Sequence, residues 1–516
     1  MSPKAWSILP LALAMTGCVS MAPRYRTPEP PVPKAWPEGP AYKGATASGQ
    51  PAVAASGQVG VAAPGQVGVA APGQPAADLP WQAFFADERL RKVLDLALRN
   101  NRDLRIAALN TEKARAYYRI QRAELLPTVN AVGYGNRQRL PASVSGTGQR
   151  IVAEQYAANV GISAWELDFF GRIRSLKNRA LEQYLATEQA RNSAQVSLLA
   201  EVANVYLALA ADRESLKLAQ ETLANQEAAY RLVRRQYDVG VVSEIDSYRA
   251  QVSVETARGD MARYTRTVAM DQNALQLLVG STVPAEWLPD ALGSVTALTD
   301  VAPDLPSEVL ARRPDILMAE NQLKAANANI GAARAAFFPR ISLTTNLGTM
   351  DRQLSGLFQS GSDAWTFSPQ IVLPIFDTGA RQANLKAANA DRDIALAQYE
   401  KAIQVAFREV ADALAQRGTL DDQLAAQESL TQALEGTYRL AQARYTAGID
   451  GYLGVLDAQR SYYAAQQGLI ALRQAKYGNL VGLYKVLGGG WDRPGRPAPT
   501  PAPAPAPAKA PAAPGS

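Results

Sequence analysis

A unit of about 190 residues occurs twice in this chain, and this duplication constrains the fold more than any single motif does. Asp103 matches Asp315, 212 residues further on, and Gly171 matches Gly379 at an offset of 208 residues. The same two offsets relate other pairs: Pro127 and Pro339, Gly240 and Gly448, Gln251 and Gln459, Gly280 and Gly488. Solenoid repeats are only about 20–45 residues long. The sequence therefore predicts two copies of one domain-sized element.

Both copies predict the same order of helices. The first helical stretch and two short alternating segments are followed by a very long helix and a returning helix: 89–126, 172–239 and 243–279 in copy one, 307–338, 380–447 and 452–487 in copy two. At about 1.5 Å per residue each long helix would extend roughly 100 Å. Aromatic residues make up only 7% of the chain and Ala is plentiful, which favours long, closely packed antiparallel helices over a compact core.

The two short segments of each copy alternate between apolar and polar residues. In 341–348 the odd positions are apolar apart from Thr345, and in 365–371 one face carries Trp, Phe, Pro and Ile. Copy one shows the pattern in 156–164, whereas its first segment, 128–138, is patterned poorly. About ten residues of this alternation are typical of a transmembrane β-strand. A soluble sandwich or hairpin with one buried face is the alternative.

The number of strands, four per chain, determines how many chains would be needed to close a membrane barrel. They cannot close a membrane barrel, because about eight is the smallest number that does. Open edges in hydrocarbon would leave backbone groups unpaired at several kcal/mol each. Several chains must therefore share one barrel if the strands lie in a membrane. Two chains would give eight strands around a filled interior, and three would give twelve around a pore.

The near-absence of His and Cys removes most of the usual catalytic and metal chemistry from this chain. It has no His and one Cys, so it cannot build an ordinary triad base, a Cys-rich zinc site or an internal disulfide. The formal net charge is +6, but Lys and Arg are scattered near Asp and Glu, without a basic block. We expect no enzyme activity, no cofactor, no metal site and no nucleic-acid partner.

The N-terminus reads as a lipoprotein signal. Residues 1–17 form a short signal peptide that ends in Met15-Thr16-Gly17, and Cys18 follows as a residue to be acylated. A simple secretory peptide with an incidental Cys is the alternative. Residues 18–78 are rich in Pro and Gly, include a tandem octapeptide repeat, and read as a flexible linker. The Pro/Ala-rich tail, 489–516, reads as disordered.

Three groups of motifs stand out in the sequence: Arg312-Arg313-Pro314-Asp315-Ile316 with 319–320, 330–334 and 338–339; Trp165-Glu166-Leu167-Asp168 with 170–172; and Pro374-Ile375-Phe376-Asp377 with Gly379. These motifs closely resemble the outer membrane factor family, the TolC-like exit ducts, and specifically its lipoprotein efflux branch. Residues 81–90 with 100–104 look like the family's opening segment. The resemblance covers nearly all of the chain from Cys18 to Gly488, and the tether 44–74 departs from the family pattern.

The resemblance implies a fold that is mainly α with membrane β. Three copies would form a twelve-stranded β-barrel, four strands per chain, continued by a long antiparallel α-helical periplasmic tube. The implied location is the outer membrane, with a lipid anchor at Cys18. The implied partners are two further copies, outer-membrane lipid, a periplasmic membrane-fusion adaptor and an inner-membrane transporter of the RND type. The implied function is an exit duct for drugs or other small toxic compounds, with metal ions or secreted protein as alternative cargo.

The expected gate lies near the tips of the long helices, where Gly240 and Gly448 permit the reversal. Leu453 and Asp457 are four residues apart and share one face of the returning helix. By resemblance they form a hydrophobic and an acidic ring at the closed periplasmic entrance, and Arg460 is expected to hold Asp457 by a charge-assisted bond. An ordinary solvated pair is the alternative. Candidate adaptor contacts are Tyr237, Gly240, Ser243, Asp246, Tyr445 and Gly448, and the strand-to-helix turns are expected at Gly171 and Gly379.

These interpretations predict six parts: a signal peptide (1–17), the acylated Cys and linker (18–78), a first repeat (79–280), a connecting loop (281–306), a second repeat (307–488) and a tail (489–516). A soluble coiled-coil scaffold is a rival interpretation. It accounts for the helices, but not for alternating segments at matching places in both copies or for the signal peptide.

Overall fold

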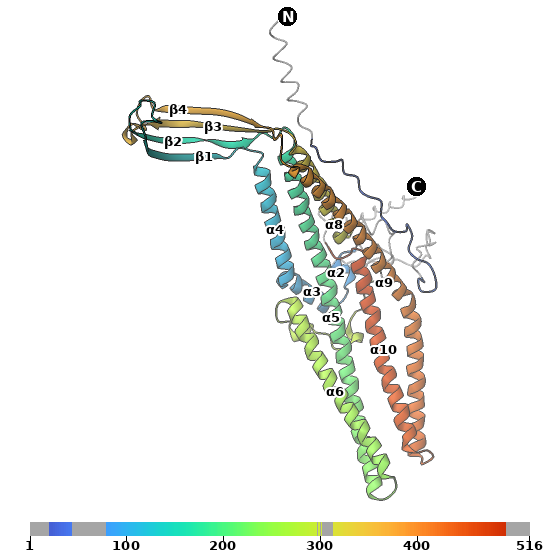
Figure 1. Ribbon diagram of the computed structural model, residues 1–516. Helices are drawn as coiled ribbons and strands as arrows, with labels where there is room; N and C mark the ends of the chain where they lie inside the picture. Colours follow the sequence, from blue (N-terminus) through green and yellow to red (C-terminus); the bar gives the residue numbers. More distant parts are fainter. Residues whose placement is uncertain (1–19, 44–78, 297, 300, 302–312, 492–516) are drawn as a thin grey trace, which may run out of the picture.

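The computed structural model describes residues 20–43, 79–296, 298–299, 301 and 313–491. Long helices lie side by side in a rod, and a four-stranded sheet projects sideways from one end (Figure 1). The predicted signal peptide, Cys18, the tandem repeat within 44–74 and the tail from residue 492 lie outside the described residues.

The two repeats have the same elements in the same order. The first contains α4 (Arg102–Ala123), β1 (Val129–Leu140), β2 (Ile151–Glu166), α5 (Arg172–Asp238) and α6 (Glu244–Val279). The second contains α8 (Pro314–Ala335), β3 (Arg340–Asp351), β4 (Asp363–Val372), α9 (Ala380–Thr446) and α10 (Tyr452–Val486). Shorter elements are α2 (Trp81–Phe84), α3 (Glu88–Asn100) and the 3-10 turns η2 (Ala285–Trp287), η3 (Leu292–Ser294) and η4 (Leu354–Gly356). All strand pairs are antiparallel, in the order β1-β2-β3-β4.

The predicted first helix of copy one, 89–126, is in fact two helices separated at Asn101. The Asn101 side chain accepts a hydrogen bond from Leu104 N at 2.8 Å, which caps α4, and its amide donates to Leu278 O at 2.8 Å. A short polar side chain that bonds the next free backbone N–H favours a helix start over a helix interior. The break therefore follows from a capping residue within the predicted helix.

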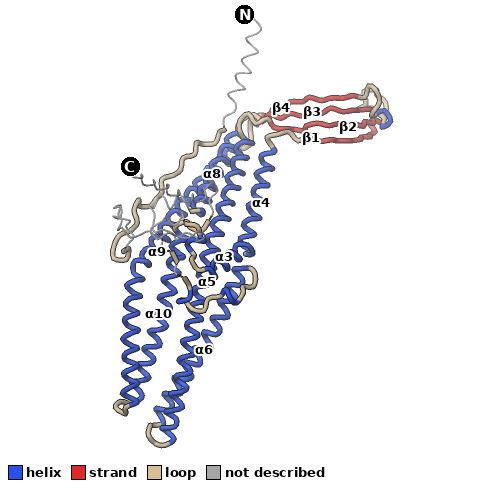
Figure 2. Tube along the Cα trace, turned by 180° about the vertical axis from the view of Figure 1, so that it is seen from behind, coloured by secondary structure: helices blue, strands red, loops and turns tan. Residues whose placement is uncertain are grey.

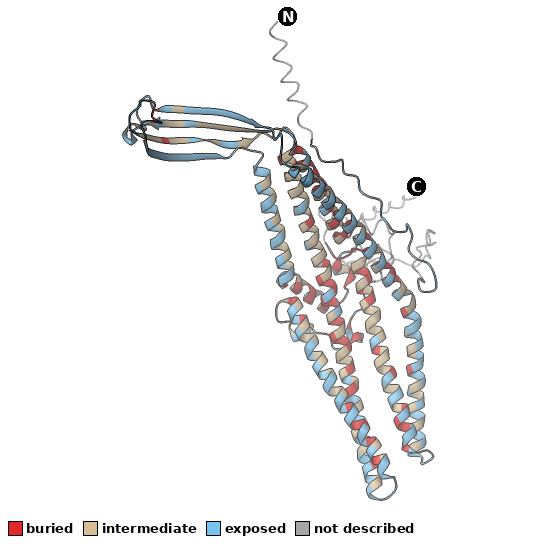
Figure 3. Cartoon of the chain, in the orientation of Figure 1, coloured by how far each residue is buried: buried red, intermediate tan, exposed pale blue. Residues whose placement is uncertain are grey.

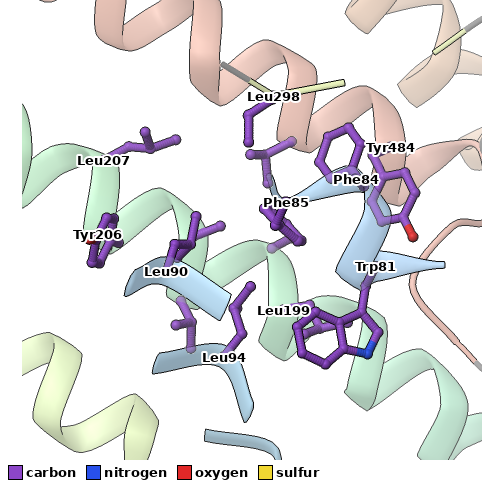
Figure 4. Packing of buried hydrophobic residues seen from close by; sticks show 14 of the residues in the cluster. Trp81, Phe84, Phe85, Leu90, Leu94, Leu199, Tyr206, Leu207, Leu298 and Tyr484 are labelled. Carbon is purple, nitrogen blue, oxygen red and sulfur yellow. The ribbon is translucent and has the colours of Figure 1, made fainter. Parts of the chain in front are cut away.

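The main core lies at mid-height, where α2, α3 and the connecting loop pack against the long helices (Figures 3 and 4). The rings of Phe84 and Tyr484 stack at 4.0 Å, and Tyr484 OH donates to Leu79 O at 2.7 Å. Paired helices bury only a narrow stripe each, so the widest burial occurs where extra segments wrap around them. One stretch of α5 is apolar and long enough to cross a membrane by length and composition, and 61% of it is buried inside the molecule.

Residues 20–43 form an extended strap along α8 and α9, which corrects the prediction of a flexible linker for this part of 18–78 (Figure 2). Asn327 Nδ2 donates to Pro23 O at 2.8 Å, Trp36 stacks on Phe407 at 5.0 Å, and Lys43 pairs with Asp422 at 2.6 Å. Composition predicted flexibility because the strap has little to bury by itself. It is ordered because its contacts are with residues hundreds of positions away.

Candidate functional site

The sheet has one apolar and one polar face, because residues directly opposite one another in neighbouring strands point to the same side. One row across the sheet consists of Ala131, Val160, Leu347 and Trp365. The adjacent row consists of Asn130, Gly161, Asn346 and Thr366. Val160, Leu347 and Trp365 are 54%, 70% and 75% exposed. A row of large apolar side chains open to this extent needs an apolar environment outside the chain.

The poorly patterned first strand is β1, and the register explains its pattern. On the apolar face it carries the small Ala131 and Gly133 and then Arg137 and Arg139, while Val132 and Tyr134 lie on the polar face opposite Asn159 and Ala157. The strand is fixed by its ladder with β2 rather than by its own alternation. Sequence pattern alone could not place it.

A β-bulge near the end of β2 was not visible in the sequence. Ala164 has φ 49°, and its backbone N–H is bonded to Thr344 Oγ1 at 3.0 Å. The pairing moves from Ile162 opposite Thr345 to Trp165 opposite Leu343. One extra residue in β2 therefore changes which positions face outward and brings Trp165 onto the apolar face.

Within one chain the sheet is open. β1 and β4 are the edge strands, and among the described residues neither has a second neighbour. An exposed ladder edge presents unpaired backbone donors and acceptors, which favours pairing with another chain. The arrangement can be completed by further copies placed edge to edge.

The sheet joins the rod through two similar turns. Gly171 and Gly379 have φ 75° and 88°, the left-handed region that favours glycine, and each precedes a long helix. Asp168 accepts from Arg174 N at 2.8 Å, and Asp377 accepts from Arg381 N at 3.0 Å. In both turns the aspartate caps the first turn of the helix and also bonds the arginine side chain.

At the far end of the rod, Gly240 and Gly448 have φ 79° and 71° at the two helix reversals. Ser243 and Asp246 form a capping box at the start of α6, with a side-chain bond of 2.6 Å. Tyr445 OH donates to Gln236 Oε1 at 2.8 Å, which links the two hairpins. The Arg234 guanidinium lies 5.2 Å from the Tyr237 ring. These candidate contact residues therefore also have structural roles.

The expected gate residues are on the surface of α10. Leu453 is 46% exposed, and Asp457 and Arg460 are exposed as well. Within this single chain the described side chains of Asp457 and Arg460 are not paired, and the expected bond between them stays a prediction. A pair at a spacing of three on a solvated helix surface is worth only a few tenths of a kcal/mol, so its absence costs little.

Repeat one has a basic residue where repeat two has the acid. Arg249 occupies the position in α6 that Asp457 occupies in α10, at the same offset of 208 residues. Arg249 lies 3.5 Å from Asp246, whereas no described residue pairs with Asp457. The two hairpins therefore present different charges at one height.

Among the described residues, no cluster of three or more His, Cys, Asp or Glu side chains is arranged to hold a metal ion.

Sequence reasoning also missed the role of the Arg-Arg-Pro-Asp-Ile motif. Arg313 is buried; it binds Asp315 and Glu409 at 2.7 Å each and donates to Val486 O at 3.1 Å. The guanidinium thus fastens the start of α8 to α9 and to the end of α10. Its partners lie up to 173 residues away, so only the motif itself was available as a signal.

Comparison with known proteins places this geometry among outer membrane proteins. The profile of the family described as "Outer membrane efflux protein" matches residues 93–281 and 305–489, one match for each repeat. The toluene efflux pump outer membrane protein TtgC of Pseudomonas putida is 48% identical over 485 residues, 94% of this chain and 95% of that protein. The antibiotic efflux pump outer membrane protein ArpC of the same species is 47% identical over 485 residues, with the same shares covered.

A solved structure supports the same comparison. The open state of the Neisseria gonorrhoeae MtrE outer membrane channel matches with a TM-score of 0.79 at 37% identity. The match covers 92% of this chain and 98% of that chain.

Proposed function

The chain belongs to the outer membrane efflux protein family, and we propose that three copies form the exit duct of a three-component pump for organic solvents and antibiotics. The protein is an outer membrane efflux channel with a periplasmic helical part, and it is not an enzyme. The proposal rests above all on the sheet: one face is apolar, the other is polar, and both edges are open.

Three copies follow from the strand count and from the helices. Twelve strands enclose a pore, whereas eight leave an interior filled by side chains. Among the described elements, α8 packs extensively against both α5 and α9, whereas α4 packs extensively against α5 only. The exposed side of α4 carries Ile106, Leu109, Tyr117 and Ile120. By the internal duplication, the α5–α8 contact is the template for a contact between α9 of one copy and α4 of the next.

The pump partners would be a periplasmic membrane-fusion adaptor and an inner-membrane transporter of the RND type. The helix tips support this, because Val239, Val241 and Ile449 are exposed apolar side chains at the reversals. We infer that the adaptor meets the rod there, and that Tyr237, Gly240, Ser243, Asp246, Tyr445 and Gly448 shape the docking surface.

The periplasmic gate would be formed by three copies of Leu453 and Asp457, brought to the axis by symmetry. Both side chains are exposed in one chain, as residues of a pore constriction must be. The three Asp457 carboxylates would repel one another at close range in the closed form. A cation bound between them, or contact with the adaptor, would therefore shift the balance between the closed and open forms. Arg460 stays a candidate partner for Asp457 of another copy.

The anchor would be a lipid on Cys18. The strap starts at Ser20, whose hydroxyl lies 3.5 Å from that of Ser175 in the first turn of α5, just below the sheet. A lipid attached two residues earlier would therefore enter the membrane beside the barrel. One acyl anchor holds weakly, and the barrel supplies the main attachment.

Cargo is tested by deleting the gene in its own host and measuring retention of labelled toluene and of an antibiotic. Retention of both should rise, and the intact gene should reverse it. Retention that is unchanged while a metal ion or a secreted protein accumulates would contradict the proposed cargo.

The gate is tested with Asp457→Ala in planar bilayers. Removing three like charges from the constriction should raise single-channel conductance severalfold in full-length protein. Glu244→Ala, an exposed acid on the other hairpin, is the matched control and should leave conductance unchanged. Equal conductance of both variants and the parent would place the constriction elsewhere.

A further inference from the structure

A shallow, open groove of about 460 Å³ lies where α8 and α9 meet the sheet. It is lined by Met21, Arg334, Phe337, Phe338, Gln382 and Leu385. Two segments form its walls: the end of α8 with Phe337 and Phe338 in the turn before β3, and the first turns of α9. The first residues of the strap form its rim.

The groove is amphipathic. Phe337, Phe338, Leu385 and Met21 make the walls apolar, and Phe337 and Phe338 are 37% and 43% exposed. Arg334 supplies a positive charge at the rim. It donates to Met21 O at 3.2 Å, and among the described residues no carboxylate pairs with it. An apolar trough with a cation at its mouth matches a lipid chain that ends in a phosphate.

The neighbouring charges leave this site positive. The Arg381 guanidinium lies 5.8 Å from the Phe337 ring, bonds Asp377 and donates to Pro374 O at 2.8 Å. Asp377 is therefore neutralised by its own partner. Arg334 remains as the charge without an acidic partner in the described part of the chain.

The groove is located at the membrane boundary on the periplasmic side. The family places the sheet in the outer membrane and the helices in the periplasm. On the apolar face of the sheet the lowest row pairs Ile341 with Ile371, only three residues beyond Phe338. Only Pro339 and Arg340 separate Ile341 from Phe338 in the sequence, and the Arg340 guanidinium is paired with Glu166 at 2.6 Å.

We propose that this groove binds a glycerophospholipid of the periplasmic leaflet, one acyl chain against Phe337, Phe338 and Leu385 and the phosphate at Arg334. A bound lipid would fix the height of the barrel in the membrane at one point in each chain. The proposal of a lipid site rests on the placement of the sheet in the outer membrane. It does not depend on the proposed cargo or on the proposed gate.

Repeat one lacks this site. The positions that match Phe337, Phe338 and Leu385 are Leu125, Leu126 and Lys177, so a charge replaces one apolar wall. The groove also lies between α8 and α9 of the same chain, whereas α4 of a neighbouring copy would meet α9 on the face that carries Ala383, which matches Ser175, the α5 residue that faces Gly331 of α8. A neighbouring copy is therefore a poorer occupant than lipid.

The test uses full-length protein in vesicles of phosphatidylethanolamine and phosphatidylglycerol that contain a phosphatidylglycerol with a photoreactive acyl chain. After illumination, mass spectrometry should find adducts on Phe337 or Phe338 and on the start of α9. Leu385→Asp and Arg334→Gln should each lower the yield at these positions roughly ten-fold, as expected for one lost apolar wall or charged hydrogen bond. Adducts on β4 should be unchanged.

Arg122→Gln is the matched control, because Arg122 is exposed and occupies the place of Arg334 in repeat one. It should leave the yield at the groove unchanged. Adducts on β4 but none in the groove would overturn the lipid site. Adducts in the groove only after Cys18→Ser would also overturn it, because the protein's own acyl chain would then be the occupant. Absence of adducts on β4 as well would refute the membrane placement itself.

Discussion

The two repeats have the same helices and strands but different surroundings. α8 buries eleven residues, from Pro314 to Ala335, whereas its counterpart α4 buries none. α8 lies between α5 and α9 and is crossed by the strap, whereas α5 is the only described element that packs extensively against α4. The comparison shows that the two copies of a duplicated helix keep the same geometry, whereas the burial of their side chains depends on the elements that pack against each of them. In the proposed trimer the second neighbour of α4 would belong to another copy, which would cover the apolar side chains that α4 exposes.

A clasp holds the first helix of each repeat to the end of its return helix, with different strength. In repeat two Arg313 donates to Val486 O; in repeat one Asn101, at the matching position, donates to Leu278 O, which matches Val486. Arg313 also binds Asp315 and Glu409. The neutral clasp makes one long-range bond, whereas the charged clasp links three elements.

The largest effect is expected from a substitution that removes the charged clasp. Arg313→Ala leaves two carboxylates beside a buried gap and should destabilise the protein by about 3 kcal/mol. Asn101→Ala loses a helix cap and one hydrogen bond and should cost about 1–2 kcal/mol. Thermal unfolding of full-length protein at one fixed concentration measures both, because oligomer stability depends on concentration. Equal losses would mean that the two clasps are equivalent despite their chemistry.

The strap fits repeat two because two helical glycines make room for it. A Cβ on Gly418 would lie 2.2 Å from Ala41 O, and one on Gly331 would lie 2.7 Å from Ala22 N. The matching residues in repeat one, Ala210 and Arg119, would not admit the same chain. The asymmetry of the strap is therefore already present in the helices that it crosses.

The next largest effect is expected from a substitution that displaces the strap from α9. Gly418→Ala should destabilise the protein by about 1–3 kcal/mol, because strap backbone must move away from the new methyl group. Gly436→Ala in the same helix is the matched control: its Cβ meets nothing within 4 Å, so the substitution should stabilise by about 0.5–1 kcal/mol. Unfolding midpoints measure both effects, and amide hydrogen exchange should rise along 20–43 in Gly418→Ala alone. Stabilisation by both variants would show that the strap does not constrain α9.

Repeat one carries an acid pair where repeat two carries none. Burial, and then the neighbouring Asp212 carboxyl, raise the pKa of Asp271 from its ordinary value to about 7. The matching positions in repeat two are Leu420 and Asn479. Asn479 is buried and donates to Ala413 O at 3.0 Å and to Gln416 Oε1 at 3.1 Å. The amide thus makes the bonds that a charged carboxyl at this position would forfeit.

The smallest effect is expected from giving Asp271 the amide that repeat two has at the matching position, in the variant Asp271→Asn. Between about pH 4 and 7 the folded protein holds a proton on Asp271 that the unfolded chain has released, so stability falls as pH rises through this window and is level above it. Asp271→Asn should remove this slope and be more stable at pH 7.5 by about 1–2 kcal/mol, discounted because the carboxyl is only partly buried. Both forms should be equally stable near pH 4, and unfolding midpoints across pH measure the difference.

The reverse exchange, Asn479→Asp, should introduce a slope of the same sign into repeat two. It also loses the donor to Ala413 O, so stability should fall further at neutral pH. A parent protein whose midpoint does not vary between pH 4 and 7.5 would contradict the raised pKa of Asp271.

Local pattern predicted the parts of this protein that depend on neighbours in sequence. The long helices were placed within one or two residues, since uninterrupted helix formers and the closing glycines at 240 and 448 act locally. Strands β3 and β4 followed from alternation. The resemblance pointed to the channel, which the comparisons support. The gate at Leu453 and Asp457 stays a prediction.

Only the tertiary structure decided the features that rest on distant contacts. The bulge at Ala164 depends on a threonine in another strand, and β1 is placed by its ladder. The strap is ordered by residues hundreds of positions away, and Arg313 finds its partners in three helices. Sequence specifies periodicity and turns because these are local free energies. Which surfaces meet depends on chain-wide packing, and there the same repeated unit has two different outcomes.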